Sequence, residues 1–457
     1  MPNRTDPQQP TIVAPATGAG GAIALIRLSG PRAIALTENV FSKPLAGAPG
    51  YTVHFGTIAD SGRVLDEVLV TLFRSPHSYT GEEMVEISCH GSPYITREIL
   101  ALFVRRGALP AGAGEFTRRA FLNGKLDLSQ AEAVADLIAS ESRAAHRIAL
   151  NQMRGGYAAE LAGMRERLLH IASLLELELD FSEEDVEFAD RTELKGLLNG
   201  LLDRCRTLAG SFRTGNVLKN GVPVAIAGAP NAGKSTLLNR LAGEERAIVS
   251  ERAGTTRDFI EESVTIEGIR FRFIDTAGLR HAEDEIEALG IERARERIRR
   301  AAIVLLLVSE PLSLEEVEER IGALSLSEEQ QLFVLLNKND LWDTAPMIQA
   351  LEGRWRVTSL SARSGEGIGE LKSLLVDSVG DSGEDDALVV SNARHYEALC
   401  SAAEALERGV EGLQCGLPAD LVSEEVRQVL HHLGMITGEI TTDDILGSIF
   451  SKFCIGK

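Results

Sequence analysis

The sequence predicts an α/β domain inserted into an all-α helical domain, with an α+β N-terminal domain before both. Three changes of pattern along the 457 residues predict this arrangement. Short β-rich runs separated by glycine turns extend from Thr11 to about Gly124, and helical apolar spacing begins at Leu128. Buried strand-like runs then alternate with helices from about Gly221, until helical spacing returns after the polar linker 380–386. Because helical segments flank the α/β segment, we expect the two helical pieces to pack together as one domain.

The expected domain boundaries follow these changes of pattern. The α+β domain is expected over 1–122, and the two parts of the helical domain over 123–216 and 381–457. The α/β domain is expected over 217–380. A chain of this length is too long for one ordinary core, which agrees with several domains.

The first two domains have recognisable elements. In the α+β domain, strands are expected at 22–29, 68–73 and 84–89, and a helix at 95–105. Ser129 followed by Glu132 predicts a capping box near the start of the helical domain. Apolar residues at helical spacing predict two packing faces, formed by Leu161, Met164, Leu168, Ala172 and Leu175, and by Leu194, Leu197, Leu198, Leu201, Leu202, Cys205 and Leu208.

Composition excludes several classes of protein. The formal charge of −20 argues against a broad nucleic-acid-coating surface, so an RNA partner must meet a local basic patch or a second protein. Five scattered cysteines without a CxxC pair suggest neither a disulfide framework nor a zinc site. The sequence has no apolar run long enough to span a membrane and its polar start lacks a signal core, so we expect a cytoplasmic protein without a membrane partner.

The α/β segment predicts a mostly parallel sheet that is covered on both faces, because its strand-like runs are continuously apolar. These runs lie at 222–227, 271–274, 303–308, 332–336 and 355–360.

A phosphate-binding motif follows the first of these strands. Residues 228–235 fit G-x-x-x-x-G-K-[ST], in which glycines let the backbone wrap phosphates at the N-terminus of the next helix. Lys234 is expected to reach the β- and γ-phosphates, and the Ser235 hydroxyl is expected to bind Mg²⁺. The expected nucleotide contacts in this loop are Asn231, Ala232, Gly233, Lys234, Ser235 and Thr236.

Four further segments complete a guanine-nucleotide site. Thr256 is expected to be a second Mg²⁺ ligand, while Asp275 holds Mg²⁺ through water and the Gly278 amide senses the γ-phosphate. Asp340 ends a strand and can accept hydrogen bonds from the guanine N1–H and exocyclic amine. The contacts expected from the later segments are Ser250, Thr255, Thr256, Asp275, Thr276, Ala277, Gly278, Asn337, Lys338, Asp340, Ser361, Ala362 and Arg363. Five elements in this order predict a Ras-like G domain that hydrolyses GTP.

The residue that orients the attacking water is not given by these motifs. In Ras-like GTPases a glutamine close after the DTAG glycine does so, but Leu279 follows Gly278 here. The acidic segment 283–287 offers either a catalytic carboxylate or an ordinary solvated face, because a water-orienting carboxylate needs only hydrogen-bond reach.

The chain resembles the bacterial tRNA-modification GTPases of the MnmE (TrmE) family from Thr11 to its end. Besides the G-domain motifs, the resemblance rests on Thr11-Ile-Val-Ala, Arg27-Leu-Ser-Gly, Ser78-Tyr-Thr-Gly-Glu, Phe121-Leu-Asn-Gly-Lys-Leu-Asp-Leu and Phe453-Cys-Ile-Gly-Lys. It implies a folate-binding N-terminal domain, a split helical domain and an inserted G domain.

The resemblance also implies partners and a reaction. It implies a homodimer formed through the N-terminal domain, which joins an FAD-containing MnmG-type subunit in a heterotetramer. Together they are expected to add an aminomethyl-type group to C5 of the wobble uridine of certain tRNAs. A tetrahydrofolate derivative, 5-formyl or 5,10-methylene, supplies the one-carbon unit. GTP hydrolysis is expected to be stimulated by K⁺, which can offset charge on the transferring phosphoryl group.

Site residues are implied in the same way. Glu287 matches the catalytic glutamate of the family, and the K⁺ ligands are Asn231, Ser250 and the backbone of Arg252 and Thr255. The implied folate-binding residues are Arg27, Glu86, Lys125 and Lys457, and Cys454 matches the C-terminal cysteine. The residues themselves leave alternatives open: ordinary surface ion pairs for the folate set, and plain packing for Cys454.

A second function shares the same G-domain motifs. A GTP-timed ribosome or RNA assembly factor would perform no covalent chemistry on RNA. The N-terminal α+β domain and the Cys-Ile-Gly-Lys tail favour the modification enzyme, and the lack of a basic RNA-binding extension weakens the alternative.

Overall fold

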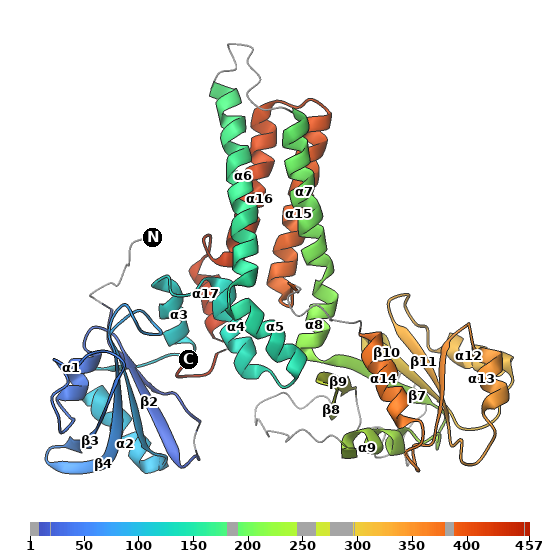
Figure 1. Ribbon diagram of the computed structural model, residues 1–457, viewed down its shortest axis with the longest axis horizontal. Helices are drawn as coiled ribbons and strands as arrows, with labels where there is room; N and C mark the ends of the chain where they lie inside the picture. The colour runs from blue at the N-terminus through green and yellow to red at the C-terminus, as the bar shows by residue number, and fades with distance from the viewer. Residues whose placement is uncertain are drawn as a thin grey trace. The chain divides into compact units, whose positions relative to one another are not determined.

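The computed structural model describes residues 9–18, 20–180, 191–244, 262–274, 296, 298–379, 388–451 and 453–457 (Figure 1). These residues fall into two compact units. The first unit comprises Met1–Ile138, Leu150–Asp203 and Ala398–Lys457, and the second comprises Ala139–Ala149 and Arg204–Glu397.

A six-stranded sheet forms the N-terminal part of the first unit, in the order β3-β4-β5-β2-β1-β6. Its described neighbours are antiparallel except β1 and β6, which are parallel. The strands are β1 Ile12–Pro15, β2 Ile23–Ser29, β3 Thr52–Asp60, β4 Arg63–Phe73, β5 Met84–His90 and β6 Leu109–Pro110. The helices are α1 Ala33–Glu38, α2 Pro93–Arg105 and α3 Glu115–Leu122. The three predicted strands and the predicted helix are confirmed.

The two faces of this sheet differ. On one face, alternate strand residues such as Ile26, Val70 and Ile87 are fully buried and pack in one core with residues of α1 and α2. On the other face, Phe55 of β3 and Leu69 of β4 are paired neighbours and are 57% and 45% exposed. Because side chains alternate across a strand, this second face stays open over β3 and β4.

The helical part of the first unit joins distant stretches of the chain. Helix α6 packs against α16, and α15 contacts both α7 and α16 (Figure 1). The predicted packing faces of α6 and α7 are buried except for Leu197, which is half-buried, and the packing of α6 against α16 confirms the pairing of the two helical pieces. The helices of this part that lie wholly in the first unit are α6 Gly156–Asp180, α16 Ala419–Thr437 and α17 Asp443–Phe450. The helices α4 Leu128–Ala139, α5 Arg143–Met153, α7 Arg191–Gly210 and α15 Ala393–Gln414 have residues in both units, and α8 Phe212–Asn220 belongs to the second unit. In the described part of the chain, no helix is both long and apolar enough to cross a bilayer.

The predicted capping box at Ser129 and Glu132 is wrong by two residues. The Gln130 amide donates to Asp127 Oδ1 at 2.9 Å, and the Asp127 amide donates to Gln130 Oε1 at 3.0 Å. Ser129 lies in the first turn of α4 and donates its hydroxyl to Asp127 Oδ1. The sequence offers two overlapping boxes, and a carboxylate such as that of Asp127 is a stronger acceptor for the first amides of the helix than the hydroxyl of Ser129.

The second unit contains another six-stranded sheet, in the order β12-β11-β10-β7-β9-β8. Neighbouring strands are parallel except the β8–β9 hairpin at one edge, and every residue of β10 is buried. The strands are β7 Val222–Gly228, β8 Glu262–Ile266, β9 Ile269–Phe273, β10 Ile303–Val308, β11 Gln331–Asn337 and β12 Arg356–Leu360. The helices are α9 Lys234–Glu244, α12 Leu314–Ala323, α13 Ala345–Leu351 and α14 Ile368–Ser378. The mostly parallel sheet is confirmed, and ligands bind such sheets beyond the carboxyl ends of the strands.

Candidate functional site

The predicted phosphate loop connects β7 to α9. Gly228, Asn231 and Gly233 all have positive φ values, of 146°, 61° and 99°. A Cβ atom on Gly228 would lie 2.6 Å from the Leu307 carbonyl oxygen, and one on Gly233 would lie 2.3 Å from Asn337 Nδ2. Glycine is therefore required at both positions by backbone conformation and by space.

Lys234 is held inside this loop. Its Nζ donates to the carbonyl oxygens of Gly228 and Ala229, at 2.8 Å each. Partial burial lowers the pKa of the Lys234 ammonium. The Ser235 hydroxyl lies in the first turn of α9, where amides without helical partners attract anions. When a nucleotide binds, Lys234 can therefore exchange its two carbonyl contacts for phosphate oxygens. The Ser235 hydroxyl beside it can supply an oxygen ligand for Mg²⁺.

Asn337 connects the phosphate loop to the expected base pocket. Its Nδ2 donates to the Ala232 carbonyl oxygen at 2.7 Å, and its Oδ1 accepts the Ala362 amide at 3.0 Å. Asn337 ends β11 and is 1% exposed, whereas Asp340 is exposed three residues later. The structure thus brings three predicted segments together at one edge of the sheet.

Arg240 in α9 joins the same segments and was not predicted. Its Nε donates to the carbonyl oxygen of Ala362 at 3.4 Å, and its Nη2 donates to that of Arg363. Arg240 belongs to no motif, and a cation six residues after Lys234 in a helix normally faces solvent. No sequence signal distinguishes it.

Several predicted residues lie outside the described residues. They are Ser250, Arg252, Thr255, Thr256, Asp275, Thr276, Ala277, Gly278 and Glu287. The second Mg²⁺ ligand, most of the K⁺ site and the catalytic glutamate therefore stay predictions. Among the described residues, no group of three or more His, Cys, Asp and Glu side chains is placed to hold a metal ion. The predicted ligands there are of another kind, the hydroxyl of Ser235 and the amide of Asn231, whose oxygens suit hard cations.

The first unit carries a separate candidate site around Arg27. Arg27 in β2 and Glu86 in β5 are cross-strand neighbours. The guanidinium donates twice to Glu86 Oε1, from Nε at 2.9 Å and from Nη2 at 2.7 Å, and Nη1 donates to the Gly456 carbonyl oxygen at 3.3 Å. The two side chains are 14% and 19% exposed, so the pair is accessible at the margin of the domain.

Two aromatic rings enclose the Arg27 guanidinium. The rings of Tyr79 and Phe116 have centroids 5.7 and 5.6 Å from the guanidinium carbon. The Tyr79 hydroxyl hydrogen-bonds the Thr117 hydroxyl at 2.8 Å, and burial raises the pKa of Tyr79. The phenol therefore stays neutral at physiological pH, and the cation is fixed between two rings. Sequence reasoning missed both aromatic residues, since neither is close to Arg27 in the chain.

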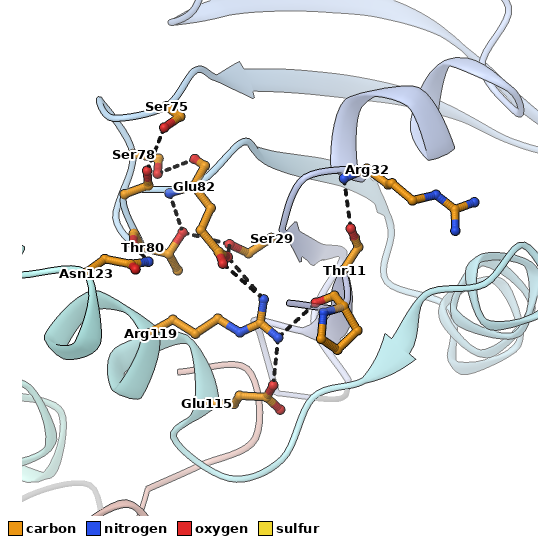
Figure 2. Close-up of polar contacts among 12 residues, drawn as sticks. Thr11, Ser29, Arg32, Ser75, Ser78, Thr80, Glu82, Glu115, Arg119 and Asn123 are labelled. Carbon is orange, nitrogen blue, oxygen red and sulfur yellow. Dashed lines mark hydrogen bonds and ion pairs between the residues drawn. The ribbon is translucent and has the colours of Figure 1, made fainter. Parts of the chain in front are cut away.

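The loop that carries Tyr79 is anchored by a buried polar network (Figure 2). Arg119 Nη1 lies 3.2 Å from Glu82 Oε2, which also accepts the Ser29 hydroxyl at 2.6 Å. The amide of Asn123 donates to the Thr80 carbonyl oxygen at 2.8 Å. Figure 2 shows Arg119 pointing from its helix toward Glu82, with Ser29 and Thr80 beside the same carboxylate. The loop 78–82 is thereby fixed to both α3 and β2.

The C-terminal tail completes the surroundings of Arg27. The Phe116 amide donates to the Lys457 carbonyl oxygen at 3.2 Å, and Ile455 forms a bridge with Ala113. A Cβ on Gly456 would lie 2.0 Å from the Pro15 carbonyl oxygen, so the tail approaches β1 as closely as a backbone can. Cys454 is exposed, and the packing interpretation of this cysteine is wrong.

The other implied folate residues are placed less directly. Lys125 donates from Nζ to the Pro76 carbonyl oxygen at 3.2 Å, and its side chain lies against Gly81. Lys457 is partly exposed beside Gly456. The structure therefore joins Arg27 directly to Glu86 and to Gly456 of the tail. Lys125 contacts Gly81 in the loop that carries Tyr79.

An apolar cavity of about 570 Å³ lies between β1, β2 and α2. Val13, Leu100 and Val104 line it, together with Ile455 of the tail. Arg97 is the one charged residue that lines it in the described part of the chain. The cavity suits apolar groups and not a phosphate or a purine base.

Comparison with known proteins identifies relatives over the whole chain. Residues 11–125 match the model of the GTP-binding protein TrmE N-terminus, and residues 128–454 match that of the MnmE helical domain. A protein of Cytophaga hutchinsonii named tRNA modification GTPase MnmE is 52% identical, with 100% of this chain and 98% of the relative covered. A protein of Christiangramia forsetii with the same name is 50% identical, with 98% and 99% covered. The G domain of the T. maritima FeoB iron transporter is 24% identical over 34% of this chain and 97% of its own, with a TM-score of 0.26.

Proposed function

The chain belongs to the MnmE (TrmE) family of tRNA-modification GTPases, and from this premise we propose a potassium-stimulated GTPase that acts on tRNA with an FAD-containing MnmG-type subunit. Together they add a folate-derived aminomethyl-type group to C5 of the wobble uridine. The observation that carries the GTPase assignment is the double contact of Asn337, which links the phosphate loop at Ala232 to the base loop at Ala362.

The catalytic roles follow from phosphoryl-transfer chemistry. Lys234 binds the β- and γ-phosphates, and Ser235 and Thr256 hold Mg²⁺, which offsets charge on the phosphates. Glu287 orients the attacking water, since Leu279 cannot. K⁺ is held by Asn231, Ser250 and the backbone of Arg252 and Thr255. Its charge offsets negative charge on the transferring phosphoryl group, as an arginine finger does in other GTPases.

The Arg27 site is proposed to bind the tetrahydrofolate derivative. A pterin offers an edge of N–H donors, which the Glu86 carboxylate can accept. Lys125 and Lys457 can pair with the carboxylates of the glutamate tail, while Arg27 holds the Glu86 carboxylate for the pterin edge. The half-buried ring of Tyr79 suits a flat ligand. Exposed Cys454 lies two residues before Gly456 of the tail, whose carbonyl oxygen accepts a hydrogen bond from Arg27.

Each proposed domain has a proposed role. The N-terminal domain, 1–122, binds folate and forms a homodimer, and the exposed apolar pair Phe55 and Leu69 supports a partner on the open face of its sheet. The G domain, 217–380, binds GTP and GDP, and it lies along the chain between the helical parts 123–216 and 381–457.

Steady-state GTP hydrolysis in KCl and in NaCl tests the GTPase mechanism. We expect faster turnover in KCl, and we expect Glu287→Ala to bind GTP normally but to hydrolyse it at least about 100-fold more slowly. Near-normal hydrolysis by Glu287→Ala would remove this residue from the mechanism. Equal rates in both salts would remove the K⁺ site.

Calorimetric titration of 5-formyltetrahydrofolate into the full-length protein tests the modification function. We expect saturable micromolar-range binding that is lost in Arg27→Ala and in a chain that ends before Cys454. A folded protein that hydrolyses GTP without binding folate would instead support the assembly-factor function.

A further inference from the structure

The loop after β12 is closed on itself by its own hydrogen bonds. The Gly365 amide donates to the Ser361 carbonyl oxygen at 2.9 Å, and the Ser364 amide donates to the Ser361 hydroxyl at 3.2 Å. The Ser361 amide in turn donates to the Glu366 carbonyl oxygen at 3.0 Å. These bonds fix the internal shape of the loop 361–365, but they do not fix its position relative to the phosphate loop.

Side chains from two other elements reach this loop in the described part of the domain. Asn337 of β11 accepts the Ala362 amide, and Arg240 of α9 donates to the carbonyl oxygens of Ala362 and Arg363. Gly365 faces the same cation, because a Cβ there would lie 3.8 Å from the guanidinium carbon. The loop therefore wraps around the end of the Arg240 side chain.

The orientation of the loop amides depends on these carbonyl contacts. In a peptide unit the carbonyl and the amide N–H point in opposite directions. Holding the Ala362 and Arg363 carbonyls toward α9 therefore limits how the peptide units of the base loop can rotate. The planar fork of a guanidinium suits two carbonyls, and its hydrogen bonds are charge-assisted. Since α9 begins at Lys234, the same helix contacts the phosphate loop at its first residue and the base loop six residues later, about 1.7 turns along the helix.

We propose that Arg240 is a positioning residue for guanine recognition. It holds the loop 361–365 so that the Arg363 amide, which shares a peptide unit with the Ala362 carbonyl, meets the 6-oxygen of the base, and it acts through the loop without touching the nucleotide. The inference rests on the proposed GTPase function and deepens it by naming what sets the base pocket relative to the phosphate loop.

Binding of two nucleotides to the full-length protein tests this role. GDP carries the 6-oxygen, whereas 2-aminopurine riboside 5′-diphosphate keeps the phosphates and the 2-amino group but lacks that oxygen and the N1–H. The loss of the N1–H weakens the analogue equally in every variant that keeps Asp340, so the effect of Arg240 is read from the change within each nucleotide. For Arg240→Ala we expect GDP affinity to fall about tenfold and affinity for the analogue to change less than about twofold. The turnover number at saturating GTP should stay within about twofold of the unsubstituted protein, because chemistry at the γ-phosphate does not involve the base loop.

Control variants separate positioning from general stability. Arg240→Lys keeps the charge without the fork and should lose part of the GDP affinity. Arg354→Ala removes an exposed cation of the same domain, which pairs with Glu318, and should leave both affinities unchanged. Equal losses for both nucleotides, or no loss, in a folded Arg240→Ala would overturn the inference.

Asp340→Asn distinguishes failure of the inference from failure of the proposed function. A shift toward xanthine nucleotides in Asp340→Asn supports the base pocket, and with unchanged Arg240→Ala it leaves only the inference refuted. Unchanged guanine selectivity in Asp340→Asn would refute the base pocket itself. If Arg240→Ala does not fold, the Arg240→Lys comparison of the two nucleotides decides the question.

Discussion

Two arginine–glutamate pairs of the N-terminal domain show how burial separates a structural contact from a candidate site. Glu82 and Arg119 are 7% and 6% exposed, and Arg119 also donates to Glu115 and to a backbone carbonyl. Arg27 and Glu86 are 14% and 19% exposed and border the C-terminal tail. The first pair is enclosed by its network, whereas the second keeps an accessible edge that a ligand can use.

The difference has an energetic consequence. Removing one partner of an enclosed pair leaves a charge without compensation in a medium of low dielectric constant. Removing one partner of an accessible pair lets water replace the lost contact. The same two residue types therefore differ in stability contribution and in availability for binding.

The largest expected effect is that of Arg119→Ala. We expect it to lower the stability of the N-terminal domain by about 3–5 kcal/mol, because the Glu82 carboxylate is left buried and unpaired. Hydrogen exchange of β5 peptides in the full-length protein measures the change. Arg105→Ala removes an exposed partner of Asp60 and serves as the matched control, with less than about 1 kcal/mol expected. Similar exchange in the two variants would contradict the distinction between the pairs.

A smaller and more local effect is expected for Gly456→Ala. Its φ is 95° and its Cβ would meet the Pro15 carbonyl oxygen, so the tail must shift, at a cost of about 1–3 kcal/mol. We expect faster hydrogen exchange at Phe116 and weaker folate binding, with β5 unchanged. Gly447→Ala is the matched control, because nothing lies within 4 Å of its Cβ and the residue is in helix α17. The idea fails if both substitutions give the same exchange at Phe116.

Arg27→Ala is expected to affect binding more than stability. Its stability change should be smaller than that of Arg119→Ala, since the Glu86 side chain is 19% exposed and water can reach it. Folate affinity should fall at least about tenfold, because a charge-assisted contact is lost. Calorimetry measures the folate affinity, and hydrogen exchange on the same sample measures the stability change. Unfolding comparable to that of Arg119→Ala would make the Arg27 pair a structural contact.

The smallest effect concerns thiol reactivity, which should differ between buried and exposed cysteines as the stability changes differ between the two ion pairs. Burial raises the pKa of Cys89 to about 11 and that of Cys205 to about 12, so at pH 8 only about one Cys89 thiol in a thousand is ionised. We expect a disulfide reagent to modify exposed Cys454 and Cys415 first, and Cys89 and Cys205 only after unfolding. Cys454→Ser and Cys415→Ser should each remove one fast thiol. Rapid modification of Cys89 in the folded protein would contradict its burial.

The part of the fold that the sequence predicts is the part written in local patterns. The strand at 303–308 is continuously apolar, and the loop 228–235 lies within one motif. Both can therefore be predicted from local sequence, and the structure confirms both. Strand β8 was not predicted, because Glu262–Ile266 lies at a sheet edge and mixes polar with apolar residues. The capping box was misplaced because two overlapping patterns satisfy the same rule.

The contacts that the sequence does not predict join distant residues. Arg240 and Ala362 are 122 residues apart, and Glu82 and Arg119 are 37 apart. Nothing in either local sequence distinguishes these cations from solvated surface residues. Their roles follow only from the packing that brings the segments together.

The attachment of the tail to the first domain has a consequence for protein synthesis. Arg27 and Gly456 are 429 residues apart. The contact between β2 and the tail can therefore form only after these 429 residues have been synthesised. At roughly 5 to 20 residues per second, the delay is about 20 to 90 s. During that time the nascent chain already carries a phosphate loop, while the surroundings of Arg27 are unfinished. Translation that stops between the phosphate loop and the tail therefore leaves a product with the phosphate loop and an incomplete Arg27 site.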